Sequence, residues 1–255
     1  MILYSVQLDM LRSKDTLYFL FRHPIKSIGA FFGRYPSDIP LKRILKGLPR
    51  NSFIIEAGAG FGEHTKIFAE SFPLGKIVAL EPIPGVYEIA KNRVKGFSNV
   101  DLRQECLTSH GDSQVEFLTD LQNPHESSSI LEVVDDFNKL YQNVRFPDRV
   151  IVQGATLDEL FLEYRRRIDL LWLDLQGMEL EILENGGKIA LQNSSYVHLE
   201  VSVRQLYRNG ANRARIIEFM SINGFEIIDA RYGVAYGNIL WKNSKTSKTN
   251  QEPFF

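Results

Sequence analysis

The sequence predicts an α/β fold with a doubly wound, mostly parallel central sheet. Short apolar runs alternate with segments of helical periodicity from residue 53 to residue 201. Such alternation produces a parallel sheet with helices on both faces. The run Ile168–Leu173 is almost wholly apolar, as expected for a parallel strand covered on both sides. A turn with three glycines follows the first strand, as in sheets that bind a ligand at their carboxyl edge.

The elements of this sheet are expected in a regular order. Strands are predicted at about 53–57, 76–81, 99–104, 168–173 and 196–201, with helices at about 63–71, 84–95, 157–166 and 178–184. Thr156 and Glu159 form a capping-box pattern before the third helix. Gly186 and Gly187 are predicted to end the fourth.

Two regions depart from this alternation, an insertion that ends near residue 148 and the C-terminal part of the chain. Short strands are predicted at 114–118, 128–134 and 150–153, a helix at 214–223, and a closing strand pair at 225–228 and 238–241.

The length of 255 residues suits one domain with an appendage. We divide the chain into an N-terminal helical extension, 1–50, a core domain, 51–242, and a polar tail, 243–255, expected to be disordered. The extension is rich in aromatic residues, and its prolines and glycines break it into short helices. A cap over the sheet or the site is the main interpretation. A homodimer contact or a membrane-surface patch is the alternative.

Composition restricts the partners and the compartment. The net charge is −1, from 30 basic and 31 acidic residues, and no basic stripe of the kind that binds nucleic acid is visible. The single cysteine, Cys106, excludes an intramolecular disulfide and suits a reducing interior. The start lacks the pattern of a signal peptide, and the apolar stretch 16–21 is too short to span a bilayer. We therefore expect a cytoplasmic protein.

The glycine-rich turn predicts a cofactor site. Glu56 ends the first strand, and Gly58, Gly60 and Gly62 follow at alternate positions. Glycines allow a close approach of the backbone to a bound molecule. Glu81 ends the second strand 21 residues after Gly60, a spacing at which an acid binds the hydroxyls of a ribose. We therefore expect a cofactor that contains adenosine.

The pattern favours S-adenosylmethionine over a dinucleotide. A dinucleotide fingerprint needs a third glycine where this chain has Glu63, an acid that a pyrophosphate would disfavour. The pattern E-x-G-x-G-x-G resembles motif I of S-adenosylmethionine-dependent methyltransferases, whose cofactor carries a sulfonium and an ammonium group. Ala59 within the turn, and Pro82, Cys106 and Leu107 after the next strands, complete the predicted cofactor residues.

Polar residues at the ends of later strands are candidates for catalysis. Asp174 follows the apolar strand 168–173, and His198 and Glu200 lie two residues apart in strand 196–201. The carboxyl ends of parallel strands meet at one edge, so these side chains are expected near the cofactor. The alternative for Asp174 is a helix cap, and for His198 a structural hydrogen-bond partner.

Five segments together resemble the FkbM-type family of S-adenosylmethionine-dependent methyltransferases, over about residues 52–230. They are Ile54-Ile-Glu-Ala-Gly-Ala-Gly-Phe-Gly62, Ala79-Leu-Glu-Pro-Ile-Pro84, Thr156-Leu-Asp-Glu-Leu160, Leu171-Trp-Leu-Asp-Leu-Gln-Gly-Met-Glu-Leu-Glu-Ile-Leu183 and Val197-His-Leu-Glu200. Glu56 stands where the family usually has Asp, and Trp172 and Gln176 stand where Lys and Glu are commoner. The first fifty residues match no pattern that we can name.

The resemblance implies methyl transfer, usually to the hydroxyl oxygen of a sugar or another small molecule. A hydroxyl is a weak nucleophile, so a base is expected, and Asp174, His198, Glu200 and His64 are the candidates. No metal-ligand spacing is recognised.

A nucleic-acid methyltransferase, the first alternative, would carry an N/D-P-P-Y-like motif where this chain reads Asp174-Leu-Gln-Gly177. A non-catalytic module that keeps the fold, the second alternative, would show damaged glycines.

Overall fold

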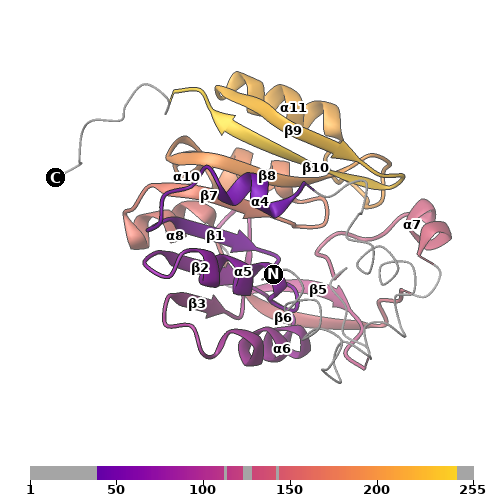
Figure 1. Cartoon of the computed structure of the whole chain (residues 1–255). Coiled ribbons are helices and arrows are strands. Elements are labelled where there is room, and N and C mark those ends of the chain that lie inside the picture. The colour runs from indigo at the N-terminus through magenta and orange to yellow at the C-terminus, as the bar shows by residue number, and fades with distance from the viewer. Residues whose placement is uncertain (1–38, 112–113, 123–127, 142–143, 246–255) are drawn as a thin grey trace.

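The centre of the molecule is a seven-stranded sheet with the order β3-β2-β1-β7-β8-β10-β9 (Figure 1). The computed structural model of the chain describes residues 39–111, 114–122, 128–141 and 144–245. The first five strands in the sheet order run parallel, and β10 and β9 are antiparallel additions at one edge. The predicted doubly wound α/β fold is therefore confirmed.

The elements have the following bounds. The strands of the main sheet are β1 Phe53–Ala57, β2 Lys76–Leu80, β3 Val100–Arg103, β7 Ile168–Leu173, β8 Ser194–Ser202, β9 Phe225–Tyr232 and β10 Tyr236–Asn243. The α-helices are α4 Leu41–Leu45, α5 Glu63–Ser71, α6 Pro84–Val94, α7 Asp135–Leu140, α8 Leu157–Tyr164, α9 Glu179–Glu181, α10 Lys188–Gln192 and α11 Arg213–Ile222, and a π-helical turn, η1 Ile182–Gly186, joins α9 to α10.

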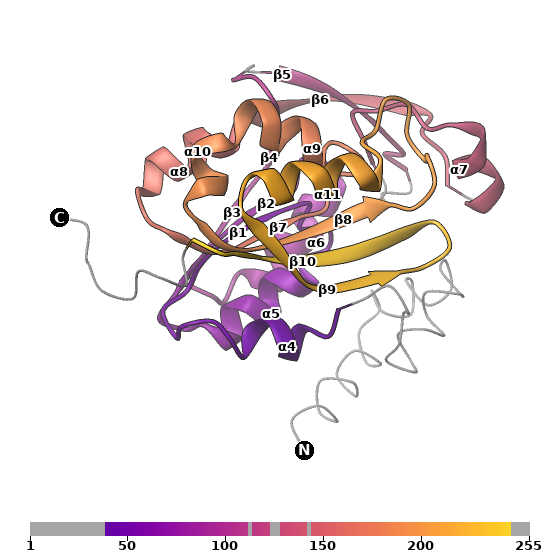
Figure 2. The ribbon, with the colours of Figure 1, turned by 90° about the horizontal axis from the view of Figure 1, so that it is seen from above.

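Helices cover both faces of the sheet (Figure 2). Helices α8 to α11 lie on one face, and α4 and α5 lie on the other. Successive residues of β7 point to opposite faces, so Leu171 and Leu173 enter one core cluster, while Leu170 and Trp172 enter the other. Burial on both sides explains the apolar run of this strand. None of the described helices has an apolar stretch long enough to cross a membrane.

A second, three-stranded sheet adjoins the first at the end of β3. It consists of β4 Glu105–Leu107, β6 Asp148–Ala155 and β5 Gln114–Thr119, in that order. Strand β6 pairs parallel with β4 and antiparallel with β5, and it is longer than the predicted strand 150–153. Cys106 and Leu107 belong to β4 and are buried.

The predicted strand 128–134 is wrong. Only isolated bridges occur there, between Ser129 and Leu118 and between Val133 and Tyr207. Ile130 packs instead against the cluster that contains Cys106 and Phe117, whereas Leu131 and Val133 pack against a satellite cluster around Phe137, Leu206 and Tyr207. Helix α7, which the sequence patterns did not predict, supplies Phe137 to this cluster. The predicted helix 178–184 is α9 followed by the π-helical turn, and α10 then continues beyond the glycine pair.

Most of the predicted N-terminal extension, residues 1–38, and the end of the tail, residues 246–255, lie outside the described residues. Residues 39–50 contain α4, and Ile39 and Ile44 are buried against Phe68 and the neighbouring strands. Arg43 forms an ion pair with Asp229 of β9 at 2.7 Å. Strand β10 runs to Asn243, one residue past the predicted end of the core domain.

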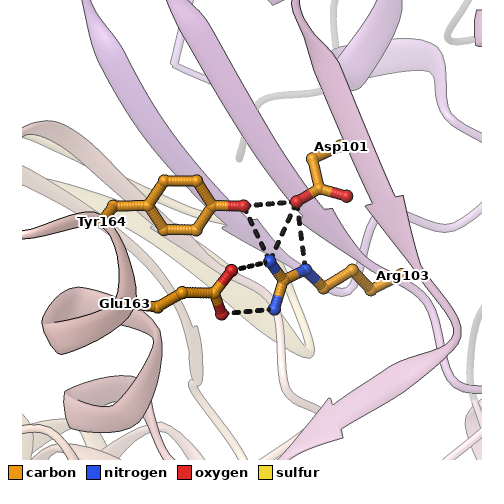
Figure 3. A network of polar contacts seen from close by, with 4 residues as sticks. All are labelled: Asp101, Arg103, Glu163 and Tyr164. Carbon is orange, nitrogen blue, oxygen red and sulfur yellow. Dashed lines mark hydrogen bonds and ion pairs between the residues drawn. The ribbon is translucent and has the colours of Figure 1, made fainter.

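A polar network fastens the edge strand β3 to helix α8 (Figure 3). The guanidinium of Arg103 donates to both carboxylate oxygens of Glu163 at 2.8 and 2.5 Å, and it also donates to Asp101 and to Tyr164. Burial and the contact with Asp101 raise the pKa of Tyr164 to about 12. Burial acts to raise the pKa of Asp101, but hydrogen bonds from Tyr164 and Arg103 outweigh it and lower that pKa.

Replacing Arg103 by methionine should therefore destabilise the domain. The side chain of Arg103 is 19% exposed, and bidentate charge-assisted bonds contribute about 1–3 kcal/mol. Arg149→Met is the matched control, because Arg149 is 60% exposed and pairs only with Glu116 among the described ion pairs; it should cost less than about 1 kcal/mol. Urea unfolding followed by circular dichroism measures both, and equal losses would contradict a special role of the network.

Candidate functional site

The glycine turn follows β1 at the carboxyl edge of the sheet. Gly58, Gly60 and Gly62 all have positive φ, at 82°, 56° and 81°. A side chain at Gly58 would collide with the backbone carbonyl oxygen of Asp174. The turn therefore needs glycine for its conformation and for the close contact between the ends of β1 and β7.

Glu81 joins the end of β2 to this turn. One carboxylate oxygen accepts the N–H of Gly60 at 2.9 Å, and the other accepts the N–H of Ile83 at 2.9 Å. Glu81 is only 5% exposed. An ionised carboxylate only accepts hydrogen bonds and offers about four lone-pair sites in all.

Two of the predicted cofactor residues lie behind the turn and outside its cavities. Glu56 is completely buried and accepts a hydrogen bond from the hydroxyl of Thr65 at 2.6 Å, which ties β1 to α5. Burial raises the pKa of Glu56 to about 8, and its second oxygen has no hydrogen-bond partner within the described structure. Gly62 packs against Ala90 of α6. Both residues thus support the turn from behind.

Two cavities open in front of the turn. The larger has a volume of about 460 Å³ and the smaller about 50 Å³. Gly58, Glu81, Asp174 and Gln176 line both cavities and so mark their junction. The larger cavity also contains the predicted residues Ala59, Gly60, His198 and Glu200, and the smaller contains Pro82, Cys106 and Leu107.

The smaller cavity is mostly apolar. Pro82 and Ile83 come from the end of β2, Cys106 and Leu107 from β4, and Phe117 from β5. Burial raises the pKa of the Cys106 thiol to about 12, so this side chain stays neutral and acts as a small apolar wall.

The side chain of Gln176 joins Asp174, at the junction, to Glu200, which lines the larger cavity. The amide nitrogen of Gln176 donates to Asp174 at 2.6 Å and to Glu200 at 3.3 Å, and the amide oxygen accepts from the hydroxyl of Tyr207. Glu179, three residues after Gln176, is buried, and burial raises its pKa to about 7. Its carboxylate accepts the N–H of Leu175 at 2.9 Å and braces the turn after β7.

His198 forms a side wall of the larger cavity. Its ring stacks on Trp172 with a centroid distance of 3.6 Å, and His64 of α5 lies against the same indole at 4.7 Å. Burial and the neighbouring His64 lower the pKa of His198 to about 3, so its imidazole is neutral at physiological pH and binds a proton weakly. Asp174 and Glu200 are better placed to accept a proton.

The structure adds residues that the sequence patterns did not single out as site residues. Gln176, Tyr207, Trp172, Tyr236 and Asn238 all line the larger cavity. Gln176 could have been found from its position two residues after Asp174 and before Gly177, where the chain turns from β7 into α9. Among the described residues, no group of three or more His, Cys, Asp or Glu side chains is arranged to hold a metal ion.

The parallel sheet and the glycine turn with its acid partner define a class I, Rossmann-like methyltransferase domain. The model of a protein family, described as "Methyltransferase FkbM domain", matches residues 56–227 of the chain. The chain belongs to this family, as the sequence motifs predicted.

Two similar proteins carry the names of methyltransferases. The chain is 23% identical to "2-O-methyltransferase NoeI" of Sinorhizobium fredii over 198 residues, which cover 75% of this chain and 79% of that protein. It is 30% identical to "Methyltransferase sdnD" of Sordaria araneosa over 165 residues, which cover 55% of this chain and 62% of that protein.

Solved structures that are similar to this chain are more distant. The Methanococcus jannaschii fibrillarin pre-rRNA processing protein has a TM-score of 0.47 at 15% identity, with 82% of this chain and 76% of that chain covered. The N-terminal domain of EvdMO1 with SAH bound has a TM-score of 0.42 at 14% identity, with 79% and 76% covered.

Adding one methyl group at Gly58 should disturb the site. Gly58→Ala combines a left-handed backbone with a collision against Asp174, so we expect a loss of at least about 1–3 kcal/mol in the free energy of unfolding. Gly96→Ala is the control, because a side chain there would meet nothing within 4 Å; it should change stability by less than about 0.5 kcal/mol. Chemical denaturation compares the two, and a fully stable Gly58→Ala would disprove the close contact.

Proposed function

We propose that this protein is an S-adenosylmethionine-dependent O-methyltransferase that acts on a hydroxyl group of a small molecule, such as a sugar. The observation that carries the proposal is the junction of the two cavities. Glu81, whose carboxylate is hydrogen-bonded to the glycine turn, and Asp174 lie at this junction. Glu200 lines the larger cavity beside them and is joined to Asp174 through Gln176.

The residues present fit this cofactor. Gly58 and Gly60 line the larger cavity, and glycines allow the backbone to approach a ligand closely. Glu81 would bind the ribose hydroxyls, and the apolar cavity with Pro82, Cys106 and Leu107 would take the adenine. When bound, S-adenosylmethionine supplies an electrophilic methyl group on a sulfonium. Gly60 and Ala59 would then lie beside the amino acid part, in the larger cavity.

The larger cavity suits an acceptor with a ring and hydroxyl groups. Its lining includes four aromatic residues, Phe137, Tyr141, Tyr207 and Tyr236, which can pack against the apolar face of a ring. Carboxylates and amides that line the same cavity can bind hydroxyls. The name of the Sinorhizobium fredii relative, a 2-O-methyltransferase, supports oxygen as the acceptor atom.

Asp174 is the base that we favour. It follows β7, its backbone N–H donates to Ala57 at 3.0 Å, and its side chain lies where the two cavities meet. An acceptor hydroxyl at this junction could donate its proton to the carboxylate while its oxygen faces the methyl donor. The enzyme mainly has to position the two reactants in line, and the base assists the weak nucleophile.

Loss of the acid on β2 should weaken cofactor binding. Glu81→Ala removes a charge-assisted hydrogen bond of about 1.5–3 kcal/mol, which corresponds to about 10- to 150-fold in affinity. Glu88→Ala, an exposed acid on α6, is the control and should bind normally. Calorimetry with S-adenosylhomocysteine and its 2′-deoxy analogue tests the contact. Wild type should bind the deoxy compound more weakly, and Glu81→Ala should not distinguish the two.

Neutralising the base should affect turnover and leave cofactor binding intact. Asp174→Asn should lower the rate of methyl transfer by about 10²–10⁴-fold, because this is the usual contribution of a general base. Labelled S-adenosylmethionine with fractionated small molecules from the source organism identifies the acceptor and gives the rate. Should Asp174→Asn turn over normally while Glu200→Gln does not, the role of base passes to Glu200.

A further inference from the structure

We propose that Gln176 is a positioning residue for the reaction: its amide joins Asp174, at the junction of the two cavities, to Glu200 in the larger cavity, and it holds both carboxylates in a fixed orientation. This inference rests on the proposed function and assigns a role to a residue next to the base. It starts from three contacts of one side chain, to Asp174, to Glu200 and to Tyr207.

The partners fix the orientation of the amide. Ionised carboxylates only accept hydrogen bonds, so the two N–H groups of Gln176 must face Asp174 and Glu200. The amide oxygen then faces the hydroxyl of Tyr207, which donates to it. Each group thus matches its partner, and neither a carboxylate nor an apolar side chain could make the same three contacts at this position.

The backbone places Gln176 where this bridge can form. Its φ is 53°, in the left-handed region that non-glycine residues seldom adopt, and Gly177 follows with a φ of 100°. Glu179 accepts the N–H of Leu175 at 2.9 Å and of Gly177 at 3.4 Å, on either side of Gln176. The hydroxyl of Ser129 donates to the Gln176 carbonyl at 3.4 Å. Unusual backbone conformations that the surroundings hold in place are common at functional sites.

The bridge has a chemical consequence for Asp174. Two carboxylates close together repel each other, and each makes the other harder to ionise. An amide between them offers both a donor, so both can stay ionised and neither needs to capture the other's proton. Other titratable groups lie around this cluster or line the same cavity: Glu56, Glu63, Glu81, Glu179, Tyr141, Tyr207, His64 and His198. The first six are acids and supply no positive charge, and burial lowers the pKa of His198 to about 3, so its ring is neutral at pH 7. His64 reaches the cavity from α5 and lies against Trp172.

Gln176→Glu is the sharpest test, since it keeps the shape and exchanges the donor for a third carboxylate. We expect the three carboxyl groups to share a proton at neutral pH, so that the last of them titrates at about pH 8 or above. NMR of ¹³C-labelled Asp and Glu side chains in the full-length chain measures this shift without any turnover. Methyl transfer at pH 7 should fall at least tenfold and recover at higher pH, while affinity for S-adenosylmethionine changes less than about threefold.

Two further variants keep the test decisive. Gln192→Glu adds the same charge at an exposed position of α10 and should leave the titration of the cluster and the rate unchanged. Gln176→Met removes the bridge without adding charge, and it should lower turnover at least tenfold with little effect on cofactor affinity. It serves in place of Gln176→Glu if that variant does not fold.

The results of these experiments distinguish the role of Gln176 from the proposed methyltransferase function. An unchanged titration in Gln176→Glu, or normal turnover in Gln176→Met, would overturn the role of Gln176. If wild type methylates no acceptor, the proposed function fails, whereas the NMR titration still decides whether Gln176 holds the two carboxylates.

Discussion

The site depends on the parallel run of four adjacent strands, β2-β1-β7-β8. Because these strands point the same way, their carboxyl ends share one edge of the sheet. Backbone hydrogen bonds fix the ends against one another: the N–H groups of Gly58 and Ala59 donate to Leu80, and the N–H of Asp174 donates to Ala57. The polar groups of the proposed reaction then project from a rigid edge. Little conformational entropy of the protein is therefore lost when ligands bind.

The geometry of the half of this edge that we propose for the cofactor was predictable, because its residues are local in sequence. The acid at the end of β2 and the glycine turn after β1 lie 21 residues apart, and the hydrogen bond between Gly60 and Glu81 spans that distance directly. A strand, a turn and a helix of standard length leave little choice of geometry between these two residues. Glu56, in contrast, was assigned to the cofactor from its pattern alone, and it lies behind the turn against Thr65.

The acceptor half was less predictable because tertiary contacts build it. Gln176 accepts a hydrogen bond from Tyr207, 31 residues further along the chain, and its backbone lies in the left-handed region. The stretch 128–134 has the composition of a strand, but its neighbours offer it no continuous partner. Part of it joins a satellite cluster around Phe137 that lines the larger cavity. Sequence periodicity does not report such packing between an insertion and distant loops.

The acids near the site have different roles, which burial decides. Glu56 and Glu179 are enclosed, and burial raises their pKa values to about 8 and about 7. A raised pKa in the folded state means that the protonated form is favoured there, so these two acids increasingly oppose folding as pH rises from their unfolded values toward those raised values. Asp174 and Glu200 reach the cavity and share the amide of Gln176. The enclosed acids hold the turns in place, and this fixed support allows the two at the cavity to meet a substrate.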